Sequence, residues 1–284
     1  MELIRGAEEL RVRVDGPRSA GASVGFVPTM GALHGGHASL IRRARSEQDL
    51  VVVSIFVNPS QFGPGEDMSL YPSDEAKDVA LCDSVGADLV WSPPHEEVYP
   101  PGVLLPTPDP GTVGETLEGA ARPGHFAGVL KAVHRLFDVV GPCAAYFGEK
   151  DAQQLFLIER MVRTLGLPIQ IVACPTVREP DGLALSSRNA YLGPEERAQA
   201  ACLFMALSEA AELAMAGERE AAALIAAMAR EIGATPLARL DHAAVVDVDT
   251  FEPVRRLEGP ARAVVAARFP SARLIDNLRL PTAG

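Results

Sequence analysis

Two histidines in the segment 28–37 are the residues whose types and spacing point most clearly to chemistry. His34 and His37 follow an apolar run and precede an amphipathic one, an order that predicts a strand, a glycine-containing turn and a helix. Residues three apart at a helix start share a face, and the backbone N–H groups and dipole there favour an anion. Gly35 and Gly36 allow a large ligand to approach the backbone. The segment therefore predicts a phosphate site with two imidazoles directed at it.

Other interpretations of this histidine pair stay open at the level of the motif. A catalytic zinc usually needs a third protein ligand, and no Glu lies between the histidines as in a metalloprotease motif. A role in capping or packing is the second alternative. The segment is not a Walker P-loop, because the Gly-x-x-x-x-Gly-Lys-Ser/Thr spacing is absent.

Amide and basic side chains follow other apolar runs. Asn58 and Gln61 offer donors and acceptors without charge, which suits hydroxyls and a carboxylate; turn formation before Pro59 is the alternative for Asn58. Arg122 and His125 flank a Gly-containing loop that enters a predicted helix. A simple helix cap is the alternative for His125.

The last two segments could bind polyphosphate. Lys150 is an ammonium at the predicted carboxyl end of a strand, and Asp151 beside it can cap a helix; a solvated charge cluster is the alternative. Ser186, Ser187 and Arg188 combine two hydroxyls with a guanidinium, a set that can bind a polyphosphate. By itself this last tripeptide is common.

The elements that must position these residues alternate up to about residue 175. Continuous apolar runs separated by helices are typical of a parallel sheet covered on both faces, whose sites lie at the carboxyl ends of its strands. The predicted strands are 24–27, 51–56, 87–91, 144–147 and 169–173. The predicted helices are 36–46, 74–85, 126–140 and 152–165. The segment 91–114, rich in Pro and Gly, is expected to be irregular.

The pattern changes after a hinge expected at 175–181. Alanine-rich helices are predicted at 194–216 and 219–232, followed by strands at 243–248, 263–267 and 274–275. We therefore predict an α/β protein with two domains. A doubly wound, Rossmann-like domain would comprise residues 1–175, and a smaller α+β domain, residues 176–284, would close over the site.

Composition excludes several classes of protein. The 284 residues, 48% of them hydrophobic, suffice for two domains with proper cores. A net charge of −11 argues against broad binding to nucleic acid or an anionic membrane. We find no signal-like N-terminus or long apolar run, and the four cysteines are widely separated. Neither secretion, membrane spanning nor a disulfide framework is expected, and a cytoplasmic location is predicted.

Together, the five segments resemble the signatures of the pantoate–β-alanine ligase family over nearly the whole chain. The first resembles the His-x-Gly-His motif of the nucleotidylyltransferase superfamily, and the Ser-Ser-Arg tripeptide stands where that superfamily has its mobile Lys-Met-Ser-Lys-Ser loop. The Asn-Pro-x-Gln-Phe segment at 58–62 and the Phe-Gly-Glu-Lys-Asp segment at 147–151 are similar to signatures of the family itself.

The resemblance implies a two-step ligation. The carboxylate of pantoate would attack the α-phosphorus of Mg-ATP, giving pantoyl adenylate and pyrophosphate. The amine of β-alanine would then attack the acyl carbon, releasing AMP and pantothenate. Positioning and electrostatic stabilisation would do most of the work.

The resemblance also implies a role for each matching residue. The implied catalytic residues are His34, His37, Lys150, Ser186 and Arg188. The implied ATP-binding residues are Pro28, Met30, His34, His37, Gly148, Lys150, Asp151, Val177, Leu185, Ser186, Ser187 and Arg188. The implied pantoate-binding residues are Asn58, Gln61 and Gln154, and β-alanine would enter past Arg122 and His125.

The chain departs from the family pattern at three places. Ser60 and Leu185 stand where the family usually has Met. Lys77 stands beside Asp78 where carboxylates linked to Mg2+ are usual, which leaves Asp78 as the candidate metal residue. The metal would then be held mostly by phosphate oxygens and water.

The implied partners are the small molecules pantoate, ATP and β-alanine, and a second copy of the chain in a homodimer. No tightly bound organic cofactor, nucleic acid or membrane is expected. The alternatives are a nucleotidyltransferase that stops after nucleotide transfer and a regulatory module with a degenerate nucleotide site. A dehydrogenase is disfavoured, because no Gly-x-Gly-x-x-Gly follows the first predicted strand.

Overall fold

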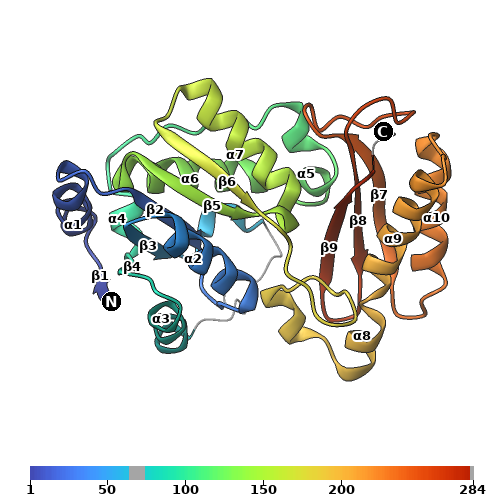
Figure 1. Cartoon of the computed structure of the whole chain (residues 1–284), viewed down its shortest axis with the longest axis horizontal. Helices are drawn as coiled ribbons and strands as arrows, with labels where there is room; N and C mark the ends of the chain where they lie inside the picture. The colour runs from blue at the N-terminus through green and yellow to red at the C-terminus, as the bar shows by residue number, and fades with distance from the viewer. Residues whose placement is uncertain (64–73, 282–284) are drawn as a thin grey trace. The chain divides into compact units, whose positions relative to one another are not determined.

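The computed structural model describes residues 1–63 and 74–281, which fold into two compact units. The first unit comprises residues 1–149 and 153–175, and the second comprises residues 150–152 and those from 176 onward. Each unit has its own sheet (Figure 1). Each also has its own hydrophobic core.

Within the described residues, the first unit contains a six-stranded parallel sheet with the order β1-β4-β3-β2-β5-β6. Its strands are Glu2–Ile4 (β1), Val24–Thr29 (β2), Leu50–Ile55 (β3), Leu89–Trp91 (β4), Cys143–Gly148 (β5) and Ile169–Cys174 (β6). From β2 the chain moves outward to β3 and β4, then returns past β2 to β5 and β6. This is the doubly wound order, and its switch point lies between β2 and β5. The predicted α/β fold is confirmed.

Helices cover both faces of this sheet. The helices up to residue 165 are Ala7–Ser19 (α1), Gly35–Glu47 (α2), Glu75–Ser84 (α3), His95–Val98 (α4), Glu118–Ala121 (α5), His125–Val140 (α6) and Ala152–Leu165 (α7). Phe26 of β2 lies against Phe137 of α6, with ring centroids 6.3 Å apart. The next residue, Val27, belongs to a buried cluster with Ile41 of α2 and Cys82 of α3. Because successive residues are buried on opposite faces, the strand is apolar throughout, which is the pattern that predicted it.

Two elements at the N-terminus lie outside the predicted set. Strand β1 pairs in parallel with β4 at an edge of the sheet. It is three residues long, too short to give a recognisable pattern. Helix α1 follows it and has only a weak apolar face, with Leu10 and Val14 buried.

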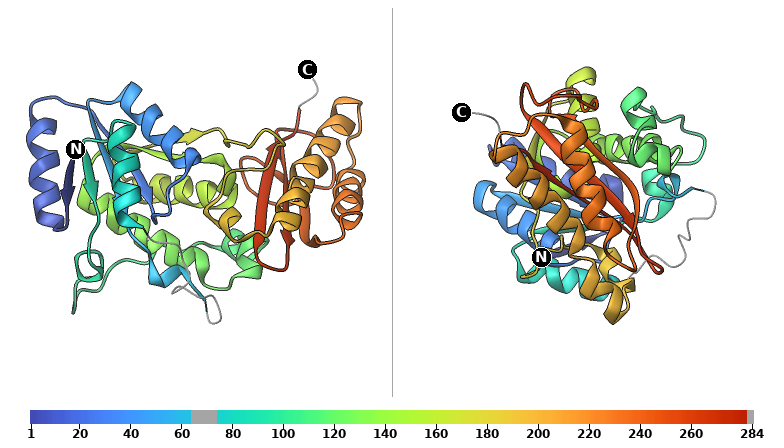
Figure 2. Two further views of the ribbon diagram at one scale, coloured as in Figure 1. Left: turned by 90° about the horizontal axis from the view of Figure 1, so that it is seen from below. Right: turned by 90° about the vertical axis from the view of Figure 1, so that its right-hand side faces the viewer.

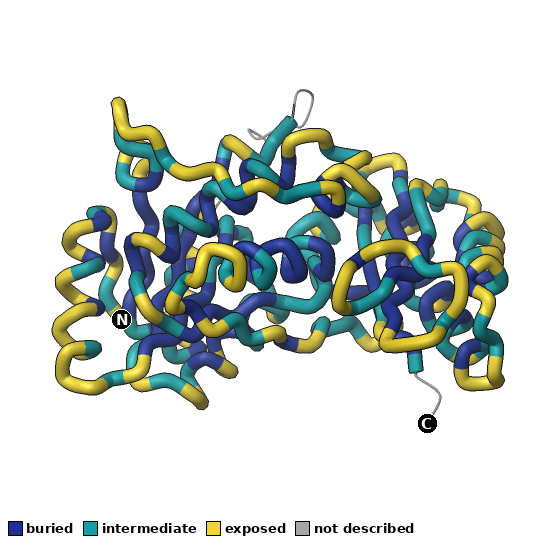
Figure 3. Tube along the Cα trace, turned by 90° about the horizontal axis from the view of Figure 1, so that it is seen from above, coloured by how far each residue is buried: buried dark blue, intermediate teal, exposed yellow. Residues whose placement is uncertain are grey.

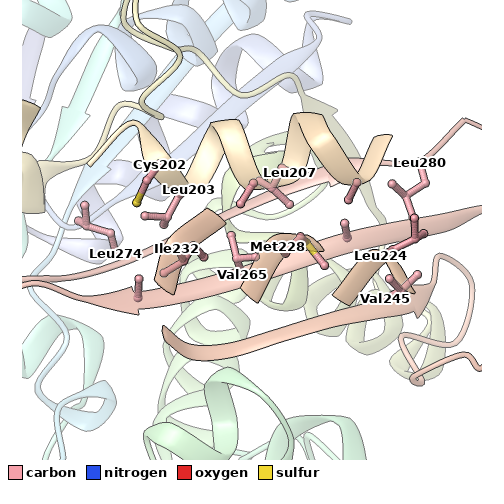
Figure 4. Packing of buried hydrophobic residues seen from close by; sticks show 14 of the residues in the cluster. Cys202, Leu203, Leu207, Leu224, Met228, Ile232, Val245, Val265, Leu274 and Leu280 are labelled. Carbon is pink, nitrogen blue, oxygen red and sulfur yellow. The ribbon is translucent and has the colours of Figure 1, made fainter. Parts of the chain in front are cut away.

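The second unit pairs helices with a three-stranded antiparallel sheet. Its strands, in the order β7-β8-β9, are Arg239–Asp247, Ala261–Arg268 and Arg273–Arg279. Its helices are Pro194–Gln199 (α8), Cys202–Met215 (α9) and Ala221–Gly233 (α10). Helices α9 and α10 lie against this sheet (Figure 2). Leu207 and Leu224 of the helices pack with Val265 of the central strand (Figure 4). The α+β prediction is confirmed, although the helix predicted at 194–216 is divided into two.

The segment Pro194–Met215 is long and apolar enough to cross a membrane, by length and composition alone. Half of its most apolar window is buried inside the protein, as in the core helix of a globular unit. Leu203, Leu207 and Ala210 of this segment are all at most 1% exposed. Along the chain as a whole, buried stretches alternate with exposed ones (Figure 3). The segment packs as a core element of the second unit.

Candidate active site

The turn after β2 places His34 and His37 at the start of α2. His34 is the N-cap residue, and its Nδ1 accepts the backbone N–H of Gly36 at 3.1 Å. His37 Nδ1 accepts the backbone N–H of His34 at 3.3 Å, so the two side chains form a reciprocal capping box. The imidazole centroids are 4.2 Å apart. The capping role that the sequence left open is therefore present for both histidines.

This capping determines which ring nitrogen of each histidine carries the proton. An Nδ1 that accepts a hydrogen bond leaves the proton of the neutral imidazole on Nε2. In the neutral rings of His34 and His37, Nε2–H is then the donor. Capping and anion binding are compatible, because they use different nitrogens of the same ring.

Backbone N–H groups of the turn are used by protein acceptors. Gly31 donates to Thr29 Oγ1 at 3.3 Å, and the next two residues, Ala32 and Leu33, donate to the carboxylate of Asp78 at 2.8 and 2.7 Å. Together with the two capping bonds, these contacts take up N–H groups at five positions. At the helix start itself, the N–H groups of His34 and Gly36 are engaged by the two imidazoles, and anion binding at this turn stays a prediction. The helix dipole and the two imidazoles favour an anion at this turn.

The amides after β3 form a network within the first unit. Asn58 is 2% exposed, and its Oδ1 accepts from the Tyr99 hydroxyl at 2.8 Å and from the Ser60 backbone at 3.1 Å. Its Nδ2 donates to Gln61 Oε1 at 3.1 Å and to the Gly128 carbonyl at 3.0 Å. Asn58 thus both forms the turn at Pro59–Gln61 (η1) and orients Gln61. The role of Tyr99 has no local signal, because it lies 41 positions away in the irregular segment.

Gln61 connects Asn58 to Met30, before the histidine turn, and to His125. Its Nε2 contacts Met30 Sδ, and Met30 directly follows β2, where Pro28 pairs with Ser54. Its backbone carbonyl accepts from His125 Nδ1 at 2.9 Å. Gln61 is predicted to bind pantoate, Met30 to line the wall between pantoate and nucleotide, and His125 to receive β-alanine. The structure places all three in the first unit, with Gln61 in contact with both of the others.

Arg122 and His125 interact directly. An Arg122 guanidinium nitrogen lies 2.9 Å from His125 Nε2. A guanidinium only donates, so Nε2 of this histidine accepts and Nδ1 carries the proton that reaches Gln61. His125 begins α6 and is 9% exposed. Its neutral tautomer is therefore the opposite of that at the capping pair.

Strand β5 ends at Gly148, beside β2, and leads to Lys150 and Asp151 in a short 3-10 turn, Glu149–Asp151 (η4). Lys150 Nζ lies 3.8 Å from Asp151 Oδ1, and the two side chains are 15% and 47% exposed. Gln154 lies half-buried in α7, whereas its neighbour Gln153 is buried and donates to the carbonyls of Val113 and Thr116 at 2.7 and 2.9 Å. The two glutamines therefore have different surroundings.

The second unit holds the remaining predicted residues on one folded-back segment. The backbone N–H of Leu185 donates to the Val177 carbonyl at 2.9 Å, which sets these two residues side by side. Ser186 Oγ accepts from the Arg188 backbone at 3.3 Å and caps the 3-10 turn Ser187–Tyr191 (η5). The Ser-Ser-Arg side chains lie at a turn start and are half-buried.

A buried ion pair supports that segment, and the sequence did not reveal it. Arg178 binds Asp276 of β9 through two contacts of 2.5 and 3.0 Å and lies 4.4 Å from the Phe204 ring centroid. Asn277, next along β9, donates from Nδ2 to the Lys150 carbonyl at 2.8 Å. The strand β9 thus supports both Lys150 and the segment that carries Ser186.

Burial raises the pKa of two groups in the site region. Burial raises the pKa of the Asp78 carboxyl, although the N–H groups of Leu33 and Ala32 oppose the shift. Burial also raises the pKa of Tyr99, which keeps the phenol protonated as a donor to Asn58. Among residues 1–63 and 74–281, no group of three or more His, Cys, Asp or Glu side chains is arranged to hold a metal ion.

The fold and the position of these residues define a class. The chain is a doubly wound α/β protein with polar side chains at the carboxyl ends of β2, β3 and β5, where proteins of this class bind their ligands.

Comparisons with known proteins identify the family. The family model for pantoate-beta-alanine ligase matches residues 2–279. A pantothenate synthetase of Rhizorhabdus wittichii is 52% identical over 285 residues and covers 100% of both chains. A crystal structure of pantothenate synthetase from Thermus thermophilus has 49% identity and a TM-score of 0.93, covering 99% of this chain and 100% of that one. The chain belongs to the pantoate–β-alanine ligase family, and the predicted family is confirmed.

A solved relative carries ligands. It is the Francisella tularensis pantoate-beta-alanine ligase complexed with beta-gamma ATP and beta-alanine, with 32% identity and a TM-score of 0.80. The alignment covers 98% of this chain and 97% of that chain.

Proposed function

We propose that this chain condenses pantoate with β-alanine to give pantothenate, while ATP is converted to AMP and pyrophosphate. The observation that carries the proposal is the capped histidine pair at the switch point of the sheet, in a chain of this family. The solved relative complexed with beta-gamma ATP and beta-alanine supports two of the three substrates.

The first step forms pantoyl adenylate. A carboxylate oxygen of pantoate bonds to the α-phosphorus of ATP, the bond from that phosphorus to the bridging oxygen of the β-phosphate breaks, and pyrophosphate leaves with both bonding electrons. Negative charge grows on the phosphate oxygens, where Nε2–H donors of His34 and His37 would stabilise it. No side chain acts as a covalent nucleophile, since the substrate carboxylate is one.

The second step forms the amide. The neutral amine of β-alanine attacks the acyl carbon, the bond from that carbon to the AMP oxygen breaks, and the amine loses a proton. Gln61 would hold the pantoyl group, with Asn58 fixing its orientation. Arg122 and His125, joined to the carbonyl of Gln61, would receive β-alanine next to that group. Gln154 would contribute to the same pantoate site.

We extend the proposal to the second unit, in which the domain formed by residues 176 onward would close over the site. Lys150, Ser186 and Arg188 would bind the phosphates and the leaving pyrophosphate, with Ser187 beside them. Gly148, Asp151, Val177 and Leu185 would contact the nucleoside. Pro28 and Met30 would line the wall between pantoate and nucleotide.

Mg-ATP is the proposed form of the nucleotide, with a homodimer as the assembly and the cytoplasm as the location. Mg2+ would screen the charge of the phosphates when bound. The chain contributes donors around those phosphates, and we assign the metal no protein ligand.

Release of pyrophosphate and AMP from ATP tests this function directly. We expect pyrophosphate release to need pantoate, and sustained AMP release to need both pantoate and β-alanine. His37→Gln should abolish both, whereas the control His134→Gln, on α6, should not. If the steady rate of pantoate-dependent pyrophosphate release does not respond to added β-alanine, the adenylation step stands and the second step uses another acceptor. No turnover at all would favour the regulatory module.

A further inference from the structure

The turn that carries the histidines has an unusual backbone. Gly31 and Ala32 both have positive φ, at 84° and 51°, and Ala32 is not a glycine. A side chain at such a φ is disfavoured, so something outside the turn must keep this conformation. The turn lies immediately before His34, so any change in it is transmitted to the capping pair.

Asp78 of α3 is the group that holds the turn. Its carboxylate is 2% exposed and accepts the consecutive N–H groups of Ala32 and Leu33, one on each oxygen. Successive N–H groups around a left-handed residue form a concave anion site. Here the anion is the Asp78 carboxylate, which lies 46 positions from Ala32 and 45 from Leu33 in the sequence.

The fit around Asp78 leaves little room for another arrangement. A Cβ at Gly31 would lie 2.9 Å from Asp78 Oδ2, so the carboxylate packs against the bare α-carbon. Leu33 is 7% exposed and is anchored in the cluster that also holds Cys82 of α3. The turn is thus fixed to α3 by both hydrogen bonds and apolar packing.

We infer that Asp78 is a positioning residue, which fixes the turn so that the Nε2–H groups of His34 and His37 point at the reacting phosphates. This inference rests on the proposed function for its catalytic consequence. The assignment differs from a metal ligand, because it makes Asp78 act through the backbone of the turn. Both carboxylate oxygens already serve that backbone.

The first test is Asp78→Asn, which keeps the shape but turns an NH2 group toward one backbone N–H. We expect kcat for adenylate formation to fall about 100-fold, as for a catalytic group displaced by about 1 Å, with a smaller change in the KM for ATP. The Mg2+ concentration for half-maximal rate should not change. Asp83→Asn removes the same charge from an exposed position on α3 and should match the wild type.

A rescue variant separates positioning from metal binding. Ala32→Gly removes the penalty of the positive φ, so the turn depends less on its clamp. We expect the double variant Ala32→Gly with Asp78→Asn to regain roughly 10-fold in kcat. Recovery by raised Mg2+ instead, or a single Asn variant within about threefold of wild type, would overturn the inference.

A spectroscopic readout needs no turnover. Nitrogen-15 shifts of the two imidazoles should report protonated Nε2 and unprotonated Nδ1 in the wild type, and a mixture in Asp78→Asn. Unchanged tautomers in that variant would contradict the inference. If the wild type makes no AMP, the proposed function fails, yet this readout still decides whether Asp78 holds the turn.

If Asp78→Asn does not fold, Ala32→Val tests the same turn with Asp78 intact. A β-branched residue at positive φ should disturb the turn and lower kcat, with unchanged Mg2+ dependence. A wild-type kcat in a folded Ala32→Val protein would contradict the inference.

Discussion

Each unit contains a buried aspartate next to predicted site residues, and the two are satisfied in opposite ways. Asp78 in the first unit is 2% exposed and is held by backbone N–H groups of Ala32 and Leu33. Asp276 in the second is 4% exposed and binds the Arg178 guanidinium as well as the Asn277 N–H. The first carboxylate shapes a turn, whereas the second neutralises a buried charge.

The different partners of the two aspartates predict which property each substitution changes. Loss of a carboxylate that faces N–H dipoles leaves polar groups unpaired, and loss of one that faces a guanidinium leaves a buried charge unpaired. Substitution of Asp276 should therefore lower mainly the free energy of unfolding, and substitution of Asp78 should lower mainly the catalytic rate.

The largest expected effect is that of Asp276→Ala. It leaves Arg178, whose side chain is 17% exposed, without its carboxylate, and we expect the free energy of unfolding to fall by about 3–5 kcal/mol. Urea denaturation measures the change. Glu220→Ala breaks an ion pair with Arg256 in which both side chains are 56% exposed, and it should cost at most about 1 kcal/mol. Equal losses in the two variants would contradict the contrast.

Asp78→Asn should have the smaller effect on stability. One N–H keeps an acceptor and the other loses it, so the free energy of unfolding should fall by about 1–3 kcal/mol. The same urea titration gives the comparison. A loss as large as that of Asp276→Ala would mean that Asp78 supports the whole unit rather than the turn.

The sequence predicted best what depends on local pattern. Strands β2 and β3 are continuous apolar runs, and the three-residue spacing of His34 and His37 already allowed a cap. The break between α8 and α9 was not predictable, since the alanines around Ala200 continue a helical pattern across it. Asp78 and Tyr99 act on partners at least 41 positions away, and no spacing rule reveals such contacts.

Tyr99→Phe should have the smallest effect of the three substitutions, because it removes a single neutral hydrogen bond. The variant removes the hydroxyl that donates to Asn58 Oδ1 and keeps the ring, which Lys131 Nζ approaches to 5.3 Å from the centroid. Losing this bond should cost about 1 kcal/mol and loosen Gln61, so the KM for pantoate should rise roughly fivefold. The KM for ATP should stay unchanged in steady-state assays.

Tyr146→Phe is the matched control for that change. Its hydroxyl donates to Glu47, the last residue of α2, whereas the histidines lie at the first turn of the same helix. This variant should lose at least as much stability, because its hydrogen bond is to a carboxylate. It should not affect the KM for pantoate, because the bond supports the far end of the helix. If both variants raised that KM equally, general loosening of the unit would explain the effect, and the Tyr99–Asn58–Gln61 connection would have no specific role. Both variants remove a tyrosine hydroxyl, so a rise in the KM for pantoate seen only in Tyr99→Phe would come from the specific contact of that hydroxyl. It would support the view that Asn58, which accepts from Tyr99, sets the orientation of Gln61.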